Sequence, residues 1–239
     1  MLKQENQHSR ELRLLVTQRC NYKCIFCHKE GLQTIQKDKL SADDFAYIFR
    51  TGKKAFGFNS ITITGGEPLL RKDIVEIVKK LKKEECKIVL TTNGFFLEEN
   101  LKIGKYIDRI NVSLHSLNFK DYESIVGIDR GFDKVIRGLA YLRIKYPNLE
   151  IRLNSTLIKG VNSSKQKIQE YIKLANKLRA SIKFVELFPK QAEGFFPLNK
   201  AKKILLELGF SVINSEDRKI DLKKGETFVR LSKIFCAFA

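Results

Sequence analysis

Proline and long apolar runs are both scarce in this chain of 239 residues. It has only 4 prolines, and 43% of its residues are hydrophobic, a balance typical of a globular rather than a disordered protein. No apolar run approaches the length of a membrane span, and residues 1–10 are polar, so we expect neither a transmembrane helix nor a signal peptide. The length favours one domain with a substantial core.

Acidic residues are outnumbered, 27 against 45 Lys and Arg, which leaves a net charge of +18. Nucleic-acid binding predicts a clustered basic patch, whereas these cations are spread along the whole chain, without an RNA-binding motif or a basic arm. We therefore expect a solvated, lysine-rich surface and no nucleic-acid partner. A basic rim would also attract a nucleotide substrate and an acidic electron donor.

Cysteine is sparse as well, yet three of the five cysteines lie together as Cys20, Cys24 and Cys27. An odd count without a signal peptide argues against disulfides and favours a reducing, cytoplasmic location. Three thiolates suit an iron–sulfur cluster or zinc, and a closed zinc site would need a fourth ligand, for which His28 is the candidate. Cys86 precedes an apolar strand and is predicted to be a buried structural residue.

Strand and helix patterns alternate along most of the chain, which predicts parallel strands joined by crossover helices. Six such repeats suit a partial (β/α)6 barrel in residues 1–198, with residues 199–239 as a short C-terminal extension of one helix and three short strands. Ser41 with Asp44 three residues later predicts a helix start. The predicted strands are 11–17, 60–64, 87–91, 109–113, 150–154 and 182–185; the helices are 41–56, 73–83, 133–145 and 165–178.

A second motif, Thr64-Gly-Gly-Glu-Pro68, follows the second predicted strand. Its glycines allow the backbone to approach a ligand closely, and Glu67 offers a carboxylate to an ammonium group. The alternative is a glycine turn with a surface acid before a helix that begins near Pro68. The carboxyl ends of strands build the active sites of such barrels, so the position favours a site.

Together, the C-x3-C-x2-C spacing, Phe26 before the third cysteine and the later GGEP motif resemble the radical S-adenosylmethionine (radical SAM) enzymes. The resemblance implies one 4Fe–4S cluster on the three cysteines, whose open iron binds the amino and carboxylate groups of SAM. It also implies reductive cleavage of SAM to a 5′-deoxyadenosyl radical that abstracts hydrogen from a substrate. Reduced flavodoxin or ferredoxin would supply the electron.

Within that superfamily, residues 11–189 resemble the GTP 3′,8-cyclases of molybdenum-cofactor biosynthesis, a lyase family, and 27–31 resembles its archaeal members. The resemblance implies SAM contacts from Phe26, Gly65, Gly66, Glu67, Thr92, Ser113 and Phe188, and substrate contacts from Arg13, Thr91 and Arg152. Guanidinium groups suit a triphosphate because they bind phosphate oxygens bidentately. The matching stretches are 12–20, 64–71, 91–94, 111–117, 152–154 and 184–188.

The chain also departs from the cyclases. Thr62 stands where they usually carry a basic residue, and His115 where they carry Asp. Cys236 resembles the first of three cysteines that hold their second cluster, but Ala239 stands where the second would be. We therefore expect one cluster, in a shortened chain, a degenerate homologue or a relative with another substrate.

Other functions remain open on this sequence. One is a radical SAM enzyme for another nucleotide, as in the viperin-like enzymes, which share Cys20-Asn-Tyr-Lys-Cys24. A peptide substrate is a further possibility within the same superfamily. A non-enzymatic zinc- or cluster-binding protein is the third, although the intact GGEP and Thr91-Thr-Asn-Gly94 motifs argue against it.

Overall fold

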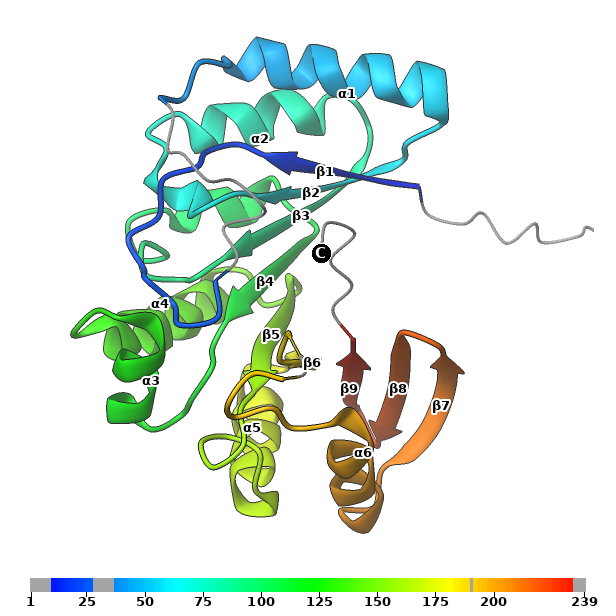
Figure 1. The fold of residues 1–239 in the computed structure, drawn as a ribbon. Coiled ribbons are helices and arrows are strands. Elements are labelled where there is room, and N and C mark those ends of the chain that lie inside the picture. Colours follow the sequence, from blue (N-terminus) through cyan, green and yellow to red (C-terminus); the bar gives the residue numbers. More distant parts are fainter. Residues whose placement is uncertain (1–9, 28–36, 190, 234–239) are drawn as a thin grey trace, which may run out of the picture.

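Nine strands form one strongly curved sheet in the computed structural model, which describes residues 10–27, 37–189 and 191–233 (Figure 1). The first six lie side by side in chain order, and each pairs in parallel with the next. This is the arrangement predicted from the alternation of patterns. The six are β1 (Glu11–Leu15), β2 (Ser60–Thr64), β3 (Lys87–Thr92), β4 (Arg109–Ser113), β5 (Glu150–Leu157) and β6 (Ser181–Glu186).

Helices cover the convex side of the sheet, as Figure 1 shows. They are α1 (Ala42–Phe56), α2 (Ile74–Lys82), α4 (Gly131–Lys145) and α5 (Lys165–Leu178). The start of α1 is the predicted capping box: Ser41 Oγ accepts from the Asp44 N–H, and the Asp44 carboxylate accepts from the Ser41 N–H. No helix of the described residues is long and apolar enough to cross a membrane.

One helix, α3 (Phe119–Val126), was not predicted. It follows β4 directly, is capped by Asn118 and has only eight residues, three of them buried. Two short 3-10 helices, η2 (Pro68–Leu70) and η3 (Leu101–Lys105), add turns after β2 and β3.

The C-terminal segment continues the same sheet. After α6 (Leu198–Glu207), β7 (Ser211–Glu216) and β8 (Lys219–Lys224) form an antiparallel hairpin, and β8 pairs with β9 (Thr227–Ser232). β9 in turn pairs in parallel with β6, so the order is β1-β2-β3-β4-β5-β6-β9-β8-β7 and the barrel stays open. The predicted partial barrel is confirmed.

The two faces of the sheet differ in polarity. Residues that point toward the helices, such as Ile110 and Leu153, are fully buried and apolar. Their neighbours in sequence, Asn111 and Arg152, are directly opposite each other in the register and point to the concave face. Closed barrels of this type usually fill their interior with branched apolar side chains. A polar concave face is therefore available for a polar ligand.

Candidate active site

The cysteine loop leaves β1 and is held by α3. The Lys23 N–H donates to the Val126 carbonyl at 2.8 Å, and the Ile25 N–H donates to the Ile125 carbonyl at 3.0 Å. Both carbonyls lie in the last turn of α3, where carbonyls lack partners within the helix. The loop thus caps the helix, and the helix fixes the loop.

Tyr22, between Cys20 and Cys24, anchors the same loop in the core. Its side chain is buried, its hydroxyl lies 3.1 Å from that of Tyr122 on α3, and its ring meets the Phe95 ring edge-on. Cys20 is exposed and Cys24 partly buried. Tyr22 therefore holds the loop in the core while the neighbouring thiols stay accessible.

The thiols themselves need a cationic partner to ionise. Although Cys20 keeps part of its surface exposed, the protein around its thiol raises its pKa, mainly by removing water from it. Burial first, and then Cys27 and Cys20, raises the pKa of Cys24 to about 12. Because these thiolates would repel one another, the donor set fits a cationic cluster core bound between them.

A ready-made site for a single ion is absent from the described residues, in which no three His, Cys, Asp or Glu side chains gather closely enough. His28, the fourth ligand of the zinc interpretation, lies outside the described residues, as do Cys236 and Ala239. Cys86 is buried, and its thiol donates to the Leu81 carbonyl, as expected of a structural residue.

The two glycines after β2 lie against the cysteine loop. The Gly66 N–H donates to the Thr17 carbonyl at 2.8 Å, and the Glu67 N–H donates to the Arg19 carbonyl at 2.7 Å. A Cβ on Gly65 would collide with the backbone of Thr17, and one on Gly66 with that of Arg19. The glycines therefore allow the backbone of Thr17 and Arg19, in the cysteine loop, to pack closely against this turn.

Glu67 points inward and is fully buried. Its Oε1 accepts from the Leu69 N–H at 2.9 Å and from the Thr92 hydroxyl at 2.6 Å, and its Oε2 accepts from the Asn93 N–H at 2.6 Å. Burial raises the pKa of Glu67 to about 7, whereas the three hydrogen bonds favour the ionised form. A carboxylate has about four acceptor positions, so little capacity remains for a ligand ammonium.

Asn93 connects Glu67 to the cysteine loop. Its Nδ2 donates to Asn21 Oδ1 at 2.8 Å and lies 3.9 Å from Cys20 Sγ. The Tyr22 N–H also donates to Cys20 Sγ, at 3.4 Å. Asn21 Nδ2 is buried and has no partner among the described residues. Amide donors thus converge on the first cysteine.

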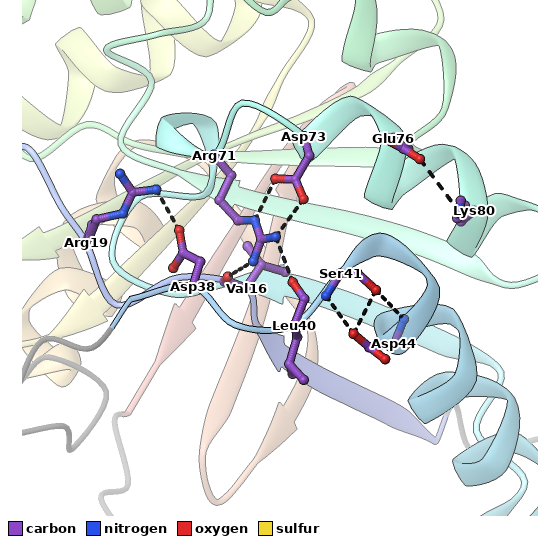
Figure 2. A network of polar contacts seen from close by, with 10 residues as sticks. All are labelled: Val16, Arg19, Asp38, Leu40, Ser41, Asp44, Arg71, Asp73, Glu76 and Lys80. Atoms are coloured by element: carbon purple, nitrogen blue, oxygen red, sulfur yellow. Dashed lines mark hydrogen bonds and ion pairs between the residues drawn. The ribbon is translucent and has the colours of Figure 1, made fainter.

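Arg71 follows the GGEP motif and bonds two separate segments, the end of β1 and the residues just before α1 (Figure 2). The guanidinium donates to the Val16 carbonyl at 2.7 Å, to the Leu40 carbonyl at 2.9 Å, and to both oxygens of Asp73. It also lies over the Phe45 ring. Arg71 therefore fixes the point where the chain leaves β1 for the cysteine loop.

Phe26 packs against His115, the residue that departs from the cyclase pattern. The ring centroids are 4.7 Å apart, and His115 is only 8% exposed. Nδ1 of His115 accepts from the Thr156 N–H, and burial lowers its pKa to about 4. A neutral imidazole with its proton on Nε2 therefore lies beside Phe26.

The remaining expected SAM residues lie at the carboxyl ends of their strands. Thr92 ends β3 and donates to Glu67, Ser113 ends β4, and Phe188 follows β6 with 40% of its surface exposed. The structure thus places the expected residues along one rim of the sheet.

The expected substrate residues lie on the concave face. Arg13 is exposed on β1 and donates to the Thr64 hydroxyl at 3.4 Å. Thr91 on β3 accepts from Asn111 Nδ2 at 3.1 Å. Arg152 on β5 is mostly buried, and burial, followed by Arg109, lowers its pKa to about 10.

Two further cations on this face were missed in the sequence, Lys183 on β6 and Arg230 on β9. They are directly opposite each other in the register, and both contribute charge near Arg152. The signal was present, because Lys183 interrupts an apolar pattern between the buried Ile182 and Phe184. That β9 lies beside β6 could not be inferred from local patterns.

Two buried acceptors lie beside these cations on the neighbouring strands β4 and β5. Oδ1 of Asn111 and Oδ1 of Asn154 have no hydrogen-bond partner among the described residues. Asn111 is opposite Arg152 in the register, and Asn154 is opposite Lys183. Buried polar atoms are normally satisfied, so these oxygens suit a ligand that donates hydrogen bonds.

Comparisons with known proteins show the family of this chain. The family description "Radical SAM superfamily" matches residues 14–175. The chain belongs to the radical SAM superfamily. The superfamily and the relatives below also make it an enzyme.

Two similar proteins are named "Probable GTP 3′,8-cyclase". That of Thermococcus kodakarensis is 34% identical over 89% of this chain and 70% of its own length; that of Pyrobaculum aerophilum is 34% identical over 83% and 66%. The chain thus spans about two thirds of the length of these radical SAM relatives. Streptococcus suis SuiB bound to S-adenosylmethionine has the same fold, with a TM-score of 0.71 and 20% identity over 95% of this chain and 51% of SuiB.

Proposed function

We propose that Cys20, Cys24 and Cys27 hold one 4Fe–4S cluster and that SAM binds beside it. The donor set supports this, since three soft cysteine ligands in one loop suit an iron–sulfur cluster that keeps one iron open. When bound, the cluster and SAM together supply a 5′-deoxyadenosyl radical. The protein's contribution is positioning and the exclusion of competing reactions.

The residues proposed for SAM differ in what they contribute. Gly66, exposed and adjacent to Arg19, and Ser113, at the end of β4, are available to the methionine end. Phe26 with His115 forms an aromatic wall suited to the adenosyl group. Glu67 holds Thr92 and Asn93 in place, so its proposed part in SAM binding is mainly to shape the surrounding backbone.

We propose a phosphorylated nucleotide as the substrate, with GTP as the first candidate because of the names of the relatives. The observation that carries this proposal is the cationic concave face, to which Arg13, Arg152 and Lys183 contribute. Guanidinium groups bind phosphate oxygens bidentately. The unpaired oxygens of Asn111 and Asn154 suit hydroxyl or amino donors of the same ligand.

Reduced flavodoxin or ferredoxin is proposed as the electron donor. Such donors are acidic, and the net charge of +18 favours their approach.

The proposed function is tested by anaerobic reconstitution of the cluster, followed by incubation with SAM, dithionite and single nucleotides. We expect a nucleoside triphosphate to raise 5′-deoxyadenosine production above the substrate-free rate, and Arg152→Gln to reduce that increase. A peptide or small metabolite that stimulates turnover, when no nucleotide does, would show that the substrate class is wrong.

A further inference from the structure

A single row of side chains crosses the concave face from β4 to β8. Residues opposite each other in the register follow in the order Ser113, Asn154, Lys183, Arg230 and Asp221. Side chains paired in this way point to the same face of a sheet. The row therefore extends from Ser113, at the candidate SAM site, to Arg230 and Asp221 on the C-terminal strands.

Lys183 is a cation without a counterion in this row. It is partly buried, and within the described residues its ammonium has no hydrogen bond or ion pair. Burial, then Arg152, Arg230 and Arg13, lowers its pKa to about 8, and Glu11 opposes the shift. Lys183 is directly opposite Arg230 in the register, and like charges opposite each other on a sheet destabilise it, so a half-buried ammonium is expected here where an anion binds.

Arg230 is oriented by Asp221. Nε and Nη2 of Arg230 donate to the two carboxylate oxygens at 2.6 and 2.7 Å. Asp221 is almost fully buried, whereas 26% of the Arg230 side chain is exposed. Nη1 of Arg230 has no partner among the described residues, so one edge of the guanidinium remains available to a ligand.

The charges of this pair and its neighbour do not balance. Asp221 neutralises Arg230, and Glu150 lies 3.7 Å from Arg152, whereas Lys183 has no ion pair among the described residues. A purely structural Arg230–Asp221 ion pair would need no further cation beside it. The excess charge faces the side of the sheet that no α-helix of the described residues covers (Figure 1).

We propose that Lys183 and Arg230 bind a phosphoryl group of the substrate, with Asp221 as the residue that orients Arg230. This inference rests on the proposed function, which it deepens by placing one phosphate between β6 and β9. Lys183 provides a point charge, and Arg230 provides donors in a fixed direction. The C-terminal strands then take part in substrate specificity.

The test uses calorimetric titration of the anaerobically reconstituted protein with inorganic tripolyphosphate, together with thermal unfolding. Lys183→Gln should weaken tripolyphosphate binding at least tenfold and, without ligand, raise the melting temperature, because repulsion is relieved. Lys203→Gln, an equal charge change on the exposed side of α6, should alter neither. Weaker binding together with a higher melting temperature would distinguish a binding role of Lys183 from a structural one, which would lower both.

Arg230→Gln alone would leave Asp221 buried and unpaired, so Arg230→Gln with Asp221→Asn is the second variant. It should also weaken tripolyphosphate binding by at least tenfold. Unchanged affinity in both variants, or an equal loss in Lys203→Gln, would overturn the inference. Nucleotide-stimulated 5′-deoxyadenosine production, measured separately, shows whether the proposed function fails or only this phosphate site.

Discussion

Glu67 and Asn93 are joined by a hydrogen bond of 2.6 Å, from the Asn93 N–H to Glu67 Oε2, in a buried position. The amide of Asn93 then extends toward Cys20 Sγ. The GGEP motif, the Thr-Asn-Gly turn after β3 and the cysteine loop are therefore one hydrogen-bonded unit. Glu67 is the acceptor that fixes this unit.

Glu67→Gln should destabilise the protein even without SAM. The amide has one acceptor oxygen in place of two, so at least one buried N–H or O–H loses its partner, at a cost of about 1–3 kcal/mol. Urea unfolding of the protein without SAM measures this difference. Glu76→Gln, on the exposed side of α2, is the control and should stay within about 0.5 kcal/mol of the wild type.

The same pair of variants separates two roles for Glu67. If the carboxylate acted only on the ammonium of SAM, Glu67→Gln would lower SAM affinity and leave the stability of the SAM-free protein unchanged. That outcome would contradict the positioning role derived from its three hydrogen bonds.

Cys24→Ala should lose its iron, whereas Cys86→Ala should retain it. Loss of one of three thiolate ligands removes a covalent attachment of the cluster, while Cys86 is buried and bonded to the Leu81 carbonyl, away from the loop. Iron analysis and visible absorbance after anaerobic reconstitution measure the difference. Equal iron in the two variants would mean that another set of ligands holds the cluster.

His115 should make the protein sensitive to acid. Its folded-state pKa of about 4 lies below the ordinary value of 6.5, so between these values the unfolded chain binds more protons than the folded one. Stability attributable to His115 is therefore complete above pH 6.5 and is lost as the pH falls toward 4, by on the order of 2–3 kcal/mol.

The matched variant for His115 is His115→Asn, whose amide oxygen can still accept from the Thr156 N–H. Urea unfolding midpoints of both proteins are measured between pH 4 and 7. The carboxylates titrate in the same way in both proteins, so the difference between the two curves gives the contribution of His115 to stability. Parallel curves for the two proteins would show that His115 does not lose stability in this way.

The sequence predicted the strands well because they are short and rich in β-branched or apolar residues, as in Ser60–Thr64, where predicted and observed limits agree. The helix at Ser41 was predictable from its capping box. Helix α3 was missed because only three of its eight residues are buried, so its periodic signal is short. These successes and this failure depend on local pattern.

The candidate site was less predictable where it depends on contacts between distant segments. The motifs pointed to Cys20, Gly66 and Glu67, but that the glycines face the cysteine loop follows from packing against Thr17 and Arg19. The pairing of β6 with β9, which brings Arg230 beside Lys183, joins segments far apart in the chain. Local propensity carries no information on such pairing.

Production of 5′-deoxyadenosine by the reconstituted protein with SAM and dithionite is the decisive measurement for a radical SAM enzyme that acts on a phosphorylated nucleotide. We expect GTP or another nucleoside triphosphate to raise this production, and guanosine without phosphates to do so far less. Cys24→Ala should abolish production altogether. If no nucleotide changes production while a peptide or unphosphorylated metabolite raises it, the nucleotide assignment is wrong.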